Sequence, residues 1–193
     1  MNSFYSEDEL KRIGFKRFGE NVLISRKASM YSPEKMIIGN NVRIDDFCIL
    51  SGEISLGSHI HIAAFCGLWG AKGIVLEDFA NLSSRISIYS ITDDFSGETM
   101  TNPTIPDLYK KIRSGKVVIK KHSLIGSTSV VLPGIEIGEG CSFGAFSFIN
   151  KSTDPWGIYA GIPIKRIKER KKDLLRLENR FLKEFNEKQK GGL

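Results

Sequence analysis

The chain of 193 residues is 41% hydrophobic and 26% charged, a composition that supports one domain with a substantial core. No apolar run approaches the roughly 20 residues that a membrane-spanning helix needs, so we expect no membrane span. The segment Met1–Tyr5 lacks the basic and apolar parts of a secretory signal, and we therefore expect a soluble, cytoplasmic protein.

The formal net charge of +6 lies in the last part of the chain. Residues 164–193 hold eleven Lys and Arg against five Asp and Glu, while residues 1–163 hold seventeen of each. A basic surface of this kind can bind nucleic acid. Here the apolar side chains among the cations recur at helical spacing, which is more typical of a helix with a solvated charged face. We therefore expect no nucleic-acid partner.

Residues 1–20 predict a short helical segment. Ser6 and Glu9 have the spacing of a capping box, in which each side chain accepts a hydrogen bond from the other residue's backbone. We expect the helix to run through Arg12 and to end at Gly14, which can adopt the left-handed conformation of a helix end.

An apolar residue recurs at every sixth position from Ile38 onward. A period of six is neither the 3.6-residue period of a helix nor the alternation of a strand, but it fits a parallel β-helix in which each flat face takes six residues. At Gly70–Gly73 the spacing between successive apolar positions is two residues longer than six. Residues 21–37 lack the period, because Arg26 and Ser32 would occupy its positions, so we expect an irregular first coil. The apolar positions, called rungs here, are Ile38, Ile44, Leu50, Leu56, Ile62, Leu68, Leu76, Leu82, Ile88, Ile119, Ile125, Val131, Ile137, Phe143 and Ile149.

A long insertion interrupts this ladder. Ile88 and Ile119 are 31 positions apart where an unbroken period would use six, so 25 residues leave the coils and return. The segment 91–116 is polar, and loops of this length in a compact domain are usually functional. The sequence thus predicts a mainly β domain over residues 21–163, with about five coils and a long loop after the third.

Residues 164–193 predict a C-terminal amphipathic helix that ends at Gly191–Gly192. Its apolar stripe consists of side chains three and four positions apart, namely Leu174, Leu177, Phe181 and Phe185.

The three cysteines share one position in the repeat. Cys48, Cys66 and Cys141 each lie two residues before a rung, where the chain turns a corner and small side chains fit. This common register predicts packing in the corners and favours neither disulfides nor a metal site.

The last coils carry motifs that are more specific than the period. They are Ile125-Gly126-Ser127, Val131-Leu132-Pro133-Gly134-Ile135-Glu136-Ile137-Gly138, Gly144-Ala145 followed by Ile149-Asn150-Lys151, and Tyr159-Ala160-Gly161-Ile162-Pro163-Ile164-Lys165. These motifs resemble the hexapeptide-repeat acyltransferases, especially the galactoside and maltose O-acetyltransferases and the capsule and O-antigen sugar acetyltransferases. The resemblance covers roughly residues 38–168. It implies a left-handed β-helix, acetyl-CoA as donor, and a homotrimer with an active site in each groove between neighbouring prisms.

The resemblance also implies where coenzyme A binds. It places the coenzyme along the C-terminal coils, with the long loop closing the groove. Small side chains there let the pantetheine arm approach the backbone, and lysines meet the phosphates. The matching positions are Ser127, Gly144, Ala145, Asn150, Lys151, Lys165 and Lys168.

One family feature is missing. Galactoside-type members carry a catalytic histidine just after the third coil, and Asp93 stands at that position here. We expect His59 and His122 on the outer surface, each three residues after a rung. His61 lies in the coil that lines the acceptor pocket in the galactoside-type enzymes. We therefore expect His61 to act as the general base, with Asp93 orienting it or the acceptor.

Two neighbours of these residues are expected to bind the acceptor. Asn81 follows one coil after His61 and stacks next to it. Asp94 stands beside Asp93, and a pair of carboxylates suits the binding of sugar hydroxyls.

The sequence favours an acetyl-CoA-dependent O-acetyltransferase that acts on a sugar of a surface polysaccharide or its precursor. The alternative is an N-acetyltransferase for an amino group of a nucleotide-linked deoxy sugar. An amine has its own lone pair, so a weaker base would suffice, which suits Asp93 in place of histidine. A zinc hydratase needs three converging histidines, which this spacing does not favour, and we expect no metal. A scaffold without catalysis is disfavoured by the coenzyme motifs.

Overall fold

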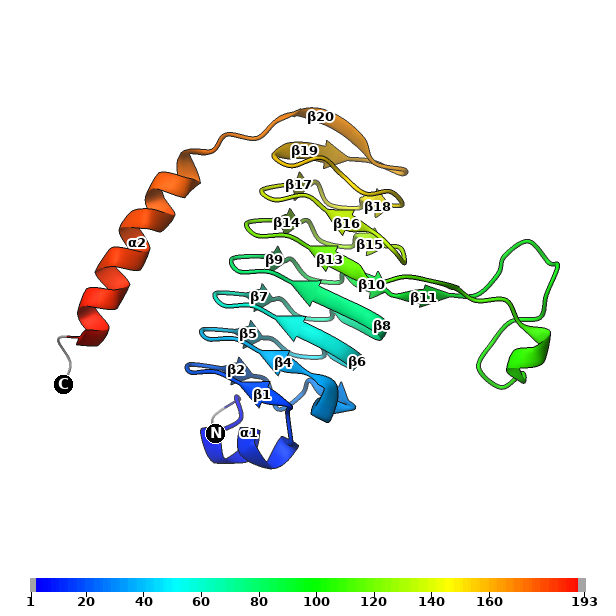
Figure 1. Ribbon diagram of the computed structural model, residues 1–193, viewed down its shortest axis with the longest axis horizontal. Helices are drawn as coiled ribbons and strands as arrows, with labels where there is room; N and C mark the ends of the chain where they lie inside the picture. The colour runs from blue at the N-terminus through cyan, green and yellow to red at the C-terminus, as the bar shows by residue number, and fades with distance from the viewer. Residues whose placement is uncertain (1–2, 191–193) are drawn as a thin grey trace.

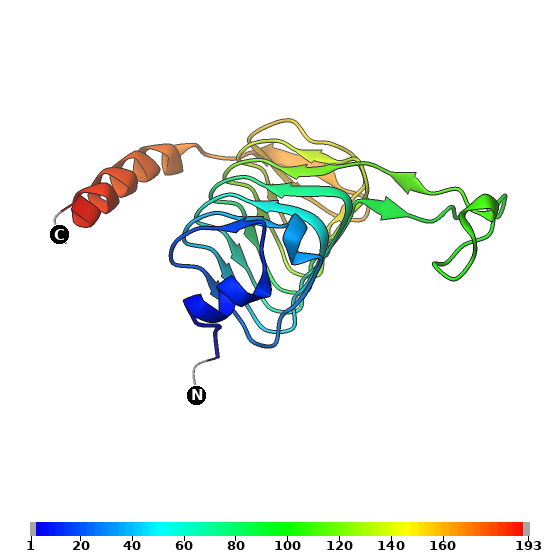
Figure 2. The same ribbon diagram turned by 60° about the horizontal axis from the view of Figure 1, so that its bottom comes forward.

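The computed structural model describes residues 3–190, with only the backbone for residues 186–190. Short parallel strands stack along one axis, a long loop projects from one side, and helix α2 lies on the other side (Figure 1). Viewed closer to the axis, successive coils superpose around one core (Figure 2). The protein is a mainly β, parallel β-solenoid with two α-helices.

The helices are α1 (Glu7–Ile13) and α2 (Asp173–Lys190), with 3₁₀ turns η1 (Pro33–Lys35) and η2 (Asp107–Tyr109). The strands are β1 (Arg17–Phe18), β2 (Leu23–Ile24), β3 (Ser29–Tyr31), β4 (Ile37–Ile38), β5 (Arg43–Ile44), β6 (Ile49–Leu56), β7 (His61–Ile62), β8 (Gly67–Leu76), β9 (Asn81–Leu82), β10 (Ser87–Tyr89), β11 (Ile91–Thr92), β12 (Arg113–Ser114), β13 (Val117–Ile119), β14 (Leu124–Ile125), β15 (Val130–Val131), β16 (Glu136–Ile137), β17 (Ser142–Phe143), β18 (Phe148–Ile149), β19 (Gly157–Ala160) and β20 (Lys165–Glu169).

The rungs form three columns, one on the inside of each face of the solenoid. Each rung pairs in register with the rung one coil away, so every coil buries its apolar side chains against its neighbours. All fifteen predicted rungs are buried, with at most 3% of their surface exposed. From the N-terminal coil, the first face carries Phe18, Ile38, Leu56, Leu76, Ile119 and Ile137, the second Ile24, Ile44, Ile62, Leu82, Ile125, Phe143 and Tyr159, and the third Met30, Leu50, Leu68, Ile88, Val131 and Ile149.

The first coil is regular, and the prediction of an irregular one is wrong. Strands β1, β2 and β3 pair in register with β4, β5 and β6. The 3₁₀ turn η1 lies between β3 and β4 and lengthens this coil by two residues, which shifts the period seen in the sequence. Strand β1 lies within residues 1–20, so that segment is helical only at α1.

Helix α1 has the predicted capping box and covers the lower end of the core. Glu9 N donates to Ser6 Oγ at 3.4 Å, and Ser6 N donates to Glu9 Oε2 at 2.8 Å. The helix ends at Gly14, which has φ +84°. Leu10 is buried, and Arg26 donates to both carboxylate oxygens of Glu9 at 2.7 Å, which ties α1 to the first coil.

The long loop leaves the solenoid through a narrow neck. Gly115 N donates to Ser90 O at 2.9 Å, and β11 pairs antiparallel with β12 just beyond it. Strand β13 then rejoins the first face by pairing with β8. The loop residues next to the neck are therefore held at a fixed place beside the coils.

The C-terminal segment differs from the prediction of a helix from residue 164 onward. Strand β20 pairs antiparallel with β19 on the last coil, and the helix starts only at Asp173. The backbone groups at the exposed edge of β19 find partners in β20, which explains why these residues are extended. The predicted helix end at Gly191–Gly192 lies outside the described residues.

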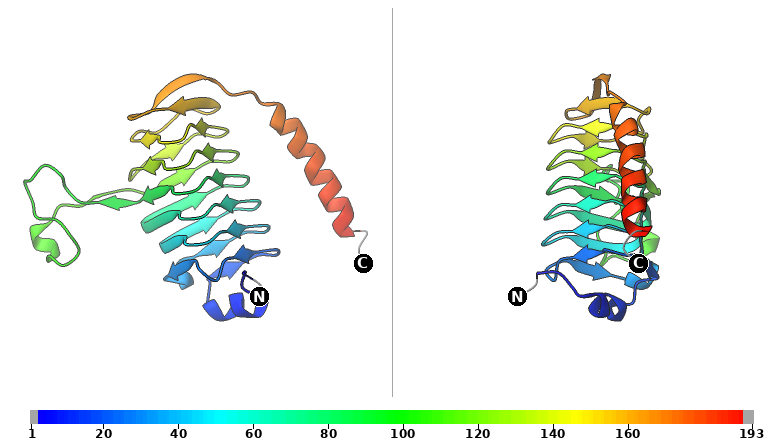
Figure 3. Two further views of the ribbon diagram at one scale, coloured as in Figure 1. Left: turned by 180° about the vertical axis from the view of Figure 1, so that it is seen from behind. Right: turned by 90° about the vertical axis from the view of Figure 1, so that its left-hand side faces the viewer.

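Helix α2 runs back alongside the coils (Figure 3). The rings of Phe181 and Phe185 lie nearly perpendicular to the ring of His59, with centroid distances of 5.2 and 5.7 Å. Among residues 3–190, no helix is long and apolar enough to cross a bilayer.

His122 is buried, so its predicted place on the outer surface is wrong. Only 7% of His122 is exposed, because Phe79 stacks on its ring at 5.2 Å and α2 covers it. Its Nε2 lies 2.9 Å from Glu178 Oε2. His59 stacks on the other side of Phe79 at 4.8 Å and is half-buried.

The cysteines pack in the corners as predicted. All three are free and buried. Each thiol donates to a backbone carbonyl, Cys48 to Ala63 at 3.2 Å, Cys66 to Ser83 at 3.1 Å and Cys141 to Asp154 at 3.0 Å.

Candidate active site

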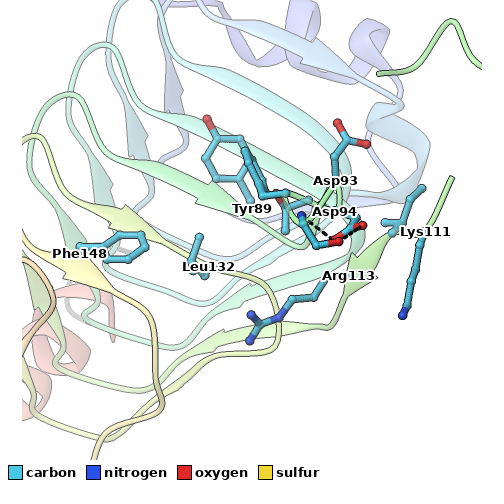
Figure 4. A pocket seen from close by; sticks show the side chains of 11 residues that line it. Tyr89, Asp93, Asp94, Lys111, Arg113, Leu132 and Phe148 are labelled. Atoms are coloured by element: carbon cyan, nitrogen blue, oxygen red, sulfur yellow. Dashed lines mark hydrogen bonds between the residues drawn. The ribbon is translucent and has the colours of Figure 1, made fainter. Parts of the chain in front are cut away.

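A groove of about 950 Å³ opens where the loop leaves the third face (Figure 4). Its inner wall is the outside of the third face, with Tyr89, Leu132 and Phe148. Its outer wall is the base of the loop, which supplies both apolar side chains and charges. The charged residues there are Asp93, Asp94, Lys111 and Arg113.

The two neighbouring aspartates differ in their hydrogen bonding. Asp94 accepts from Ser96 N at 3.1 Å, from Ser96 Oγ at 2.7 Å and from Thr99 Oγ1 at 3.2 Å. The bonds from Ser96 hold the pKa of Asp94 below its ordinary value. Asp94 therefore organises the start of the loop, a contribution that the sequence did not predict.

Asp93 is free to meet a ligand. Within residues 3–190, its carboxylate accepts no hydrogen bond. The residue is half-buried and lines the groove. In Figure 4 the Asp93 side chain points away from the Asp94 carboxylate. The groove thus holds one carboxylate engaged in loop structure and one available for binding.

His61 lies on another part of the molecule. It projects from β7 on the outside of the second face, where His61 Nε2 is 2.8 Å from Asp45 Oδ2. Arg43 Nε donates to the other oxygen of Asp45 at 2.7 Å. Burial acts to raise the pKa of Asp45, but the bonds to His61 and Arg43 outweigh it and lower the pKa. The partner of His61 is therefore Asp45, which the sequence did not predict.

The structure does not bring His61 and Asp93 together within one chain. Asp93 belongs to the groove on the third face, and the residues that line this groove do not include His61 in the described chain. Asn81 pairs with His61 in register and is exposed. The joint role of His61, Asn81 and Asp93 remains a prediction that requires a second subunit.

Part of the predicted coenzyme site forms the corner between the second and third faces. Phe146 N donates to Ser127 O at 2.9 Å, which stacks one corner on the next. A Cβ on Gly126 would lie 2.6 Å from Ala145 N, so glycine is needed for this close stacking. Gly144 and Ala145 are exposed and leave the backbone of this corner accessible.

The remaining coenzyme positions lie at the other border of the third face and above it. Asn150 follows β18, and its Oδ1 atom is buried without a hydrogen-bond partner in the described residues. Lys151 is exposed at the next position, and Lys165 and Lys168 are exposed on β20. The predicted coenzyme positions thus border the face that carries Leu132 and Phe148.

The three histidines do not converge on one site. His59 and His122 stack on Phe79, whereas His61 bonds to Asp45. In the described part of the chain, no group of three His, Cys, Asp or Glu is arranged to hold a metal ion.

Sequence reasoning missed the cations of the groove. The pairing of β11 with β12 brings Lys111 and Arg113 back beside the aspartates, 17 to 20 positions after them. The alternation of charged and apolar side chains at Lys111, Ile112 and Arg113 was the available signal for a strand at these positions. It did not indicate which segment this strand would pair with.

Comparison with known proteins places this geometry in a family. A family model described as bacterial transferase hexapeptide, six repeats, matches residues 116–151. The dTDP-4-amino-4,6-dideoxy-D-glucose acyltransferase of Escherichia coli is 46% identical over 182 residues, covering 93% of this chain and 95% of that protein. The chain belongs to the hexapeptide-repeat acyltransferases.

Solved structures give the same family and fold. AntD, an N-acyltransferase from Bacillus cereus in complex with dTDP and 3-hydroxybutyryl-CoA, is 55% identical, with a TM-score of 0.95 over 96% of this chain and all of that one.

A more distant relative by sequence is WbbJ of Escherichia coli K12, named for lipopolysaccharide O-acetyl transfer, at 27% identity over 76% of this chain and 74% of that protein. The chain is therefore an acyltransferase of the hexapeptide-repeat family.

Proposed function

We propose that the protein transfers an acyl group from acyl-CoA to the 4-amino group of a dTDP-linked 4-amino-4,6-dideoxy sugar. The similarity to the Escherichia coli acyltransferase along nearly the full length of both chains carries this proposal. AntD, with its bound dTDP and 3-hydroxybutyryl-CoA, supports the same donor and acceptor classes. The proposed acceptor is an amino group and not the hydroxyl group that the sequence favours.

The groove suits an amine better than a hydroxyl. The amine lone pair attacks the thioester carbonyl, a C–N bond forms, the C–S bond breaks, and coenzyme A leaves as the thiolate, which then takes up a proton to give the thiol. After attack the nitrogen carries a positive charge and its proton is acidic, so a carboxylate suffices to accept it. Asp93, which has no hydrogen-bond partner in residues 3–190, is the residue that we assign to hold the amino group and take this proton.

The coenzyme is expected to follow the third face toward the last coils. The unpartnered Oδ1 of Asn150 supports this path, because a buried acceptor without a hydrogen bond costs free energy that a ligand amide N–H would recover. The exposed backbone at Gly144 and Ala145 fits an extended pantetheine arm.

Replacing Lys151 or Lys165 with alanine is expected to weaken coenzyme A binding about tenfold or more and to leave acceptor binding unchanged. Both side chains are exposed beside the proposed phosphate end, where a charge-assisted contact is worth about 1.5–3 kcal/mol. Calorimetry with coenzyme A and its dephospho form measures this effect. Lys35→Ala, an exposed lysine in η1, is the control. Unchanged affinity in both variants would show that these lysines are only solvated.

We further propose the left-handed coil and the homotrimer that the family resemblance implies. Two observations support an assembly in which neighbouring chains complete each other's site. Helix α2 exposes the apolar side chains Leu177 and Phe181. The two predicted catalytic residues, His61 and Asp93, lie on different faces of one chain. We expect the reaction to take place in the cytoplasm, where acyl-CoA donors are made.

Sugar O-acetylation is the second candidate. A carboxylate-bound imidazole is the arrangement that proton abstraction from a hydroxyl needs, and the 2.8 Å contact between His61 and Asp45 provides it. In this reading His61 is the base and the similarity to WbbJ indicates the reaction class. His61→Asn separates the two candidates, since a general base contributes roughly 10²–10⁴-fold. Retention of more than about a tenth of the activity would rule out His61 as the base.

The proposed function is tested by mixing the protein with acetyl-CoA or 3-hydroxybutyryl-CoA and dTDP-4-amino-4,6-dideoxyglucose. We expect one thiol released for each amide formed, with the amide identified by mass spectrometry. Absence of product with both donors would refute the proposal.

A further inference from the structure

A pair of stacked aromatic rings lies at the border of the groove that faces the N-terminal coils. Trp69 and Tyr89 occupy the same column on the outside of the third face, paired in register between β8 and β10. Their rings are parallel to within 5°, with centroids 4.7 Å apart. Leu132 follows one coil above, so the column changes there from large flat rings to a smaller side chain.

Gly67 leaves room for this stack to lie against the solenoid. A Cβ on Gly67 would overlap the indole of Trp69, so glycine at this position lets the indole lie against its own strand. Trp69 is only half-buried and supports Tyr89 from below. Of the two rings, Tyr89 lines the groove and Trp69, in the described chain, does not. The groove therefore ends at Tyr89.

The rest of the groove gives a direction to a bound thioester. The cations Lys151, Lys165 and Lys168 lie at the C-terminal end of the solenoid, beyond Phe148 and Leu132. Asp93 enters the groove four positions after Tyr89. With the coenzyme phosphates at the cationic end and the reacting carbonyl near Asp93, the acyl chain is the part of the donor that points toward Tyr89.

We propose that Tyr89, supported by Trp69, is the floor of the acyl pocket and limits the length of the acyl chain that the enzyme transfers. This inference rests on the proposed function. The apolar lining from Tyr89, Leu132 and Ile112 suits a short chain longer than acetyl, since each buried methylene changes binding about fourfold. A chain that reaches the Tyr89 ring cannot extend further.

The test compares kcat/KM for acetyl-, butyryl-, hexanoyl- and octanoyl-CoA with a fixed dTDP-4-amino-4,6-dideoxyglucose acceptor. For the unmodified protein we expect octanoyl-CoA to be at least tenfold poorer than butyryl-CoA. Tyr89→Ala is expected to raise the ratio of octanoyl to butyryl transfer at least tenfold. Tyr89→Leu, which keeps an apolar side chain, is expected to raise it less and guards against loss of folding in the alanine variant.

Tyr31→Ala is the matched control, because Tyr31 lies in the same column two coils below Trp69 and is 59% exposed outside the groove. It is expected to leave the chain-length profile unchanged. An unchanged profile in both Tyr89 variants, an equal loss with every donor, or a higher KM for the sugar nucleotide alone would overturn the inference, as would efficient octanoyl transfer by the unmodified protein. No transfer from any donor by the unmodified protein would instead refute the proposed function.

Discussion

Replacing Asp93 with asparagine is expected to lower kcat/KM for acyl transfer about a hundredfold. The asparagine side chain has nearly the same shape but cannot accept the proton that the amine must lose, and it cannot pair with the positive charge on the nitrogen. General acid–base groups typically contribute 10²–10⁴-fold, and an amine acceptor places the effect at the low end of that range. Initial rates of thiol release with dTDP-4-amino-4,6-dideoxyglucose measure it.

Asp107→Asn is the control for this change. Asp107 belongs to the same loop, its side chain is 92% exposed, and its partner is Lys110 at 3.0 Å, outside the groove. This control is expected to keep more than half of the activity. An Asp93→Asn variant as active as Asp107→Asn would show that Asp93 does not take part in the reaction.

Replacing Glu178 with glutamine is expected to loosen α2 from the coils without unfolding the solenoid. Glu178 binds Lys121 Nζ at 2.6 Å and His122 Nε2 at 2.9 Å, with 9% of its side chain exposed. The substitution removes the charge between these two groups, and we expect it to cost about 2 kcal/mol of docking free energy. Hydrogen exchange over residues 173–185 should then be about thirtyfold faster.

Glu184→Gln tests whether any carboxylate on α2 has this effect. Glu184 binds Arg180 at 2.7 Å with 55% of its side chain exposed, and such surface pairs contribute little. Equal effects of the two substitutions on exchange would contradict the docking role of Glu178.

The same contact predicts a pH dependence. Burial acts to raise the pKa of Glu178, but the bonds from Lys121 and His122 outweigh it and lower the pKa in the folded protein. Because this pKa is lowered, the charged carboxylate of Glu178 contributes fully to docking at pH values above the ordinary glutamate pKa. The contribution is lost as the pH falls through the lowered pKa. The protection of α2 against exchange, corrected for the intrinsic pH dependence of amide exchange, should therefore fall on acidification in the unmodified protein and change less in Glu178→Gln.

The period of six was sufficient to predict the core because each rung contacts only the coils directly next to it. Ile125, for example, pairs with Leu82 and Phe143, one coil away on each side. The first coil escaped prediction because η1 adds two residues and shifts the phase at one point. A search that allowed a two-residue shift, as seen at Gly70–Gly73, would have found Phe18, Ile24 and Met30.

Contacts between distant segments were not predictable in the same way. His122 is buried by a helix that begins about fifty residues later, and the repeat contains no information about where that helix docks. Within the described residues the Asp93 carboxylate accepts no hydrogen bond and the Asp94 carboxylate accepts three, a difference set by the fold of the loop, which has no period. The sequence therefore predicted a catalytic role for Asp93 and an acceptor-binding role for Asp94, but not the hydrogen bonds that Asp94 accepts from Ser96 and Thr99.

The most direct test of the account compares two acceptors that differ at one atom. dTDP-4-amino-4,6-dideoxyglucose and dTDP-6-deoxyglucose carry an amino group and a hydroxyl group at the same carbon. With either acetyl-CoA or 3-hydroxybutyryl-CoA as donor, we expect kcat/KM for the amino sugar to exceed that for the hydroxy sugar by at least a thousandfold, and His61→Asn to leave this preference intact. Equal or faster acylation of the hydroxyl, lost in His61→Asn, would contradict the assignment as an N-acyltransferase.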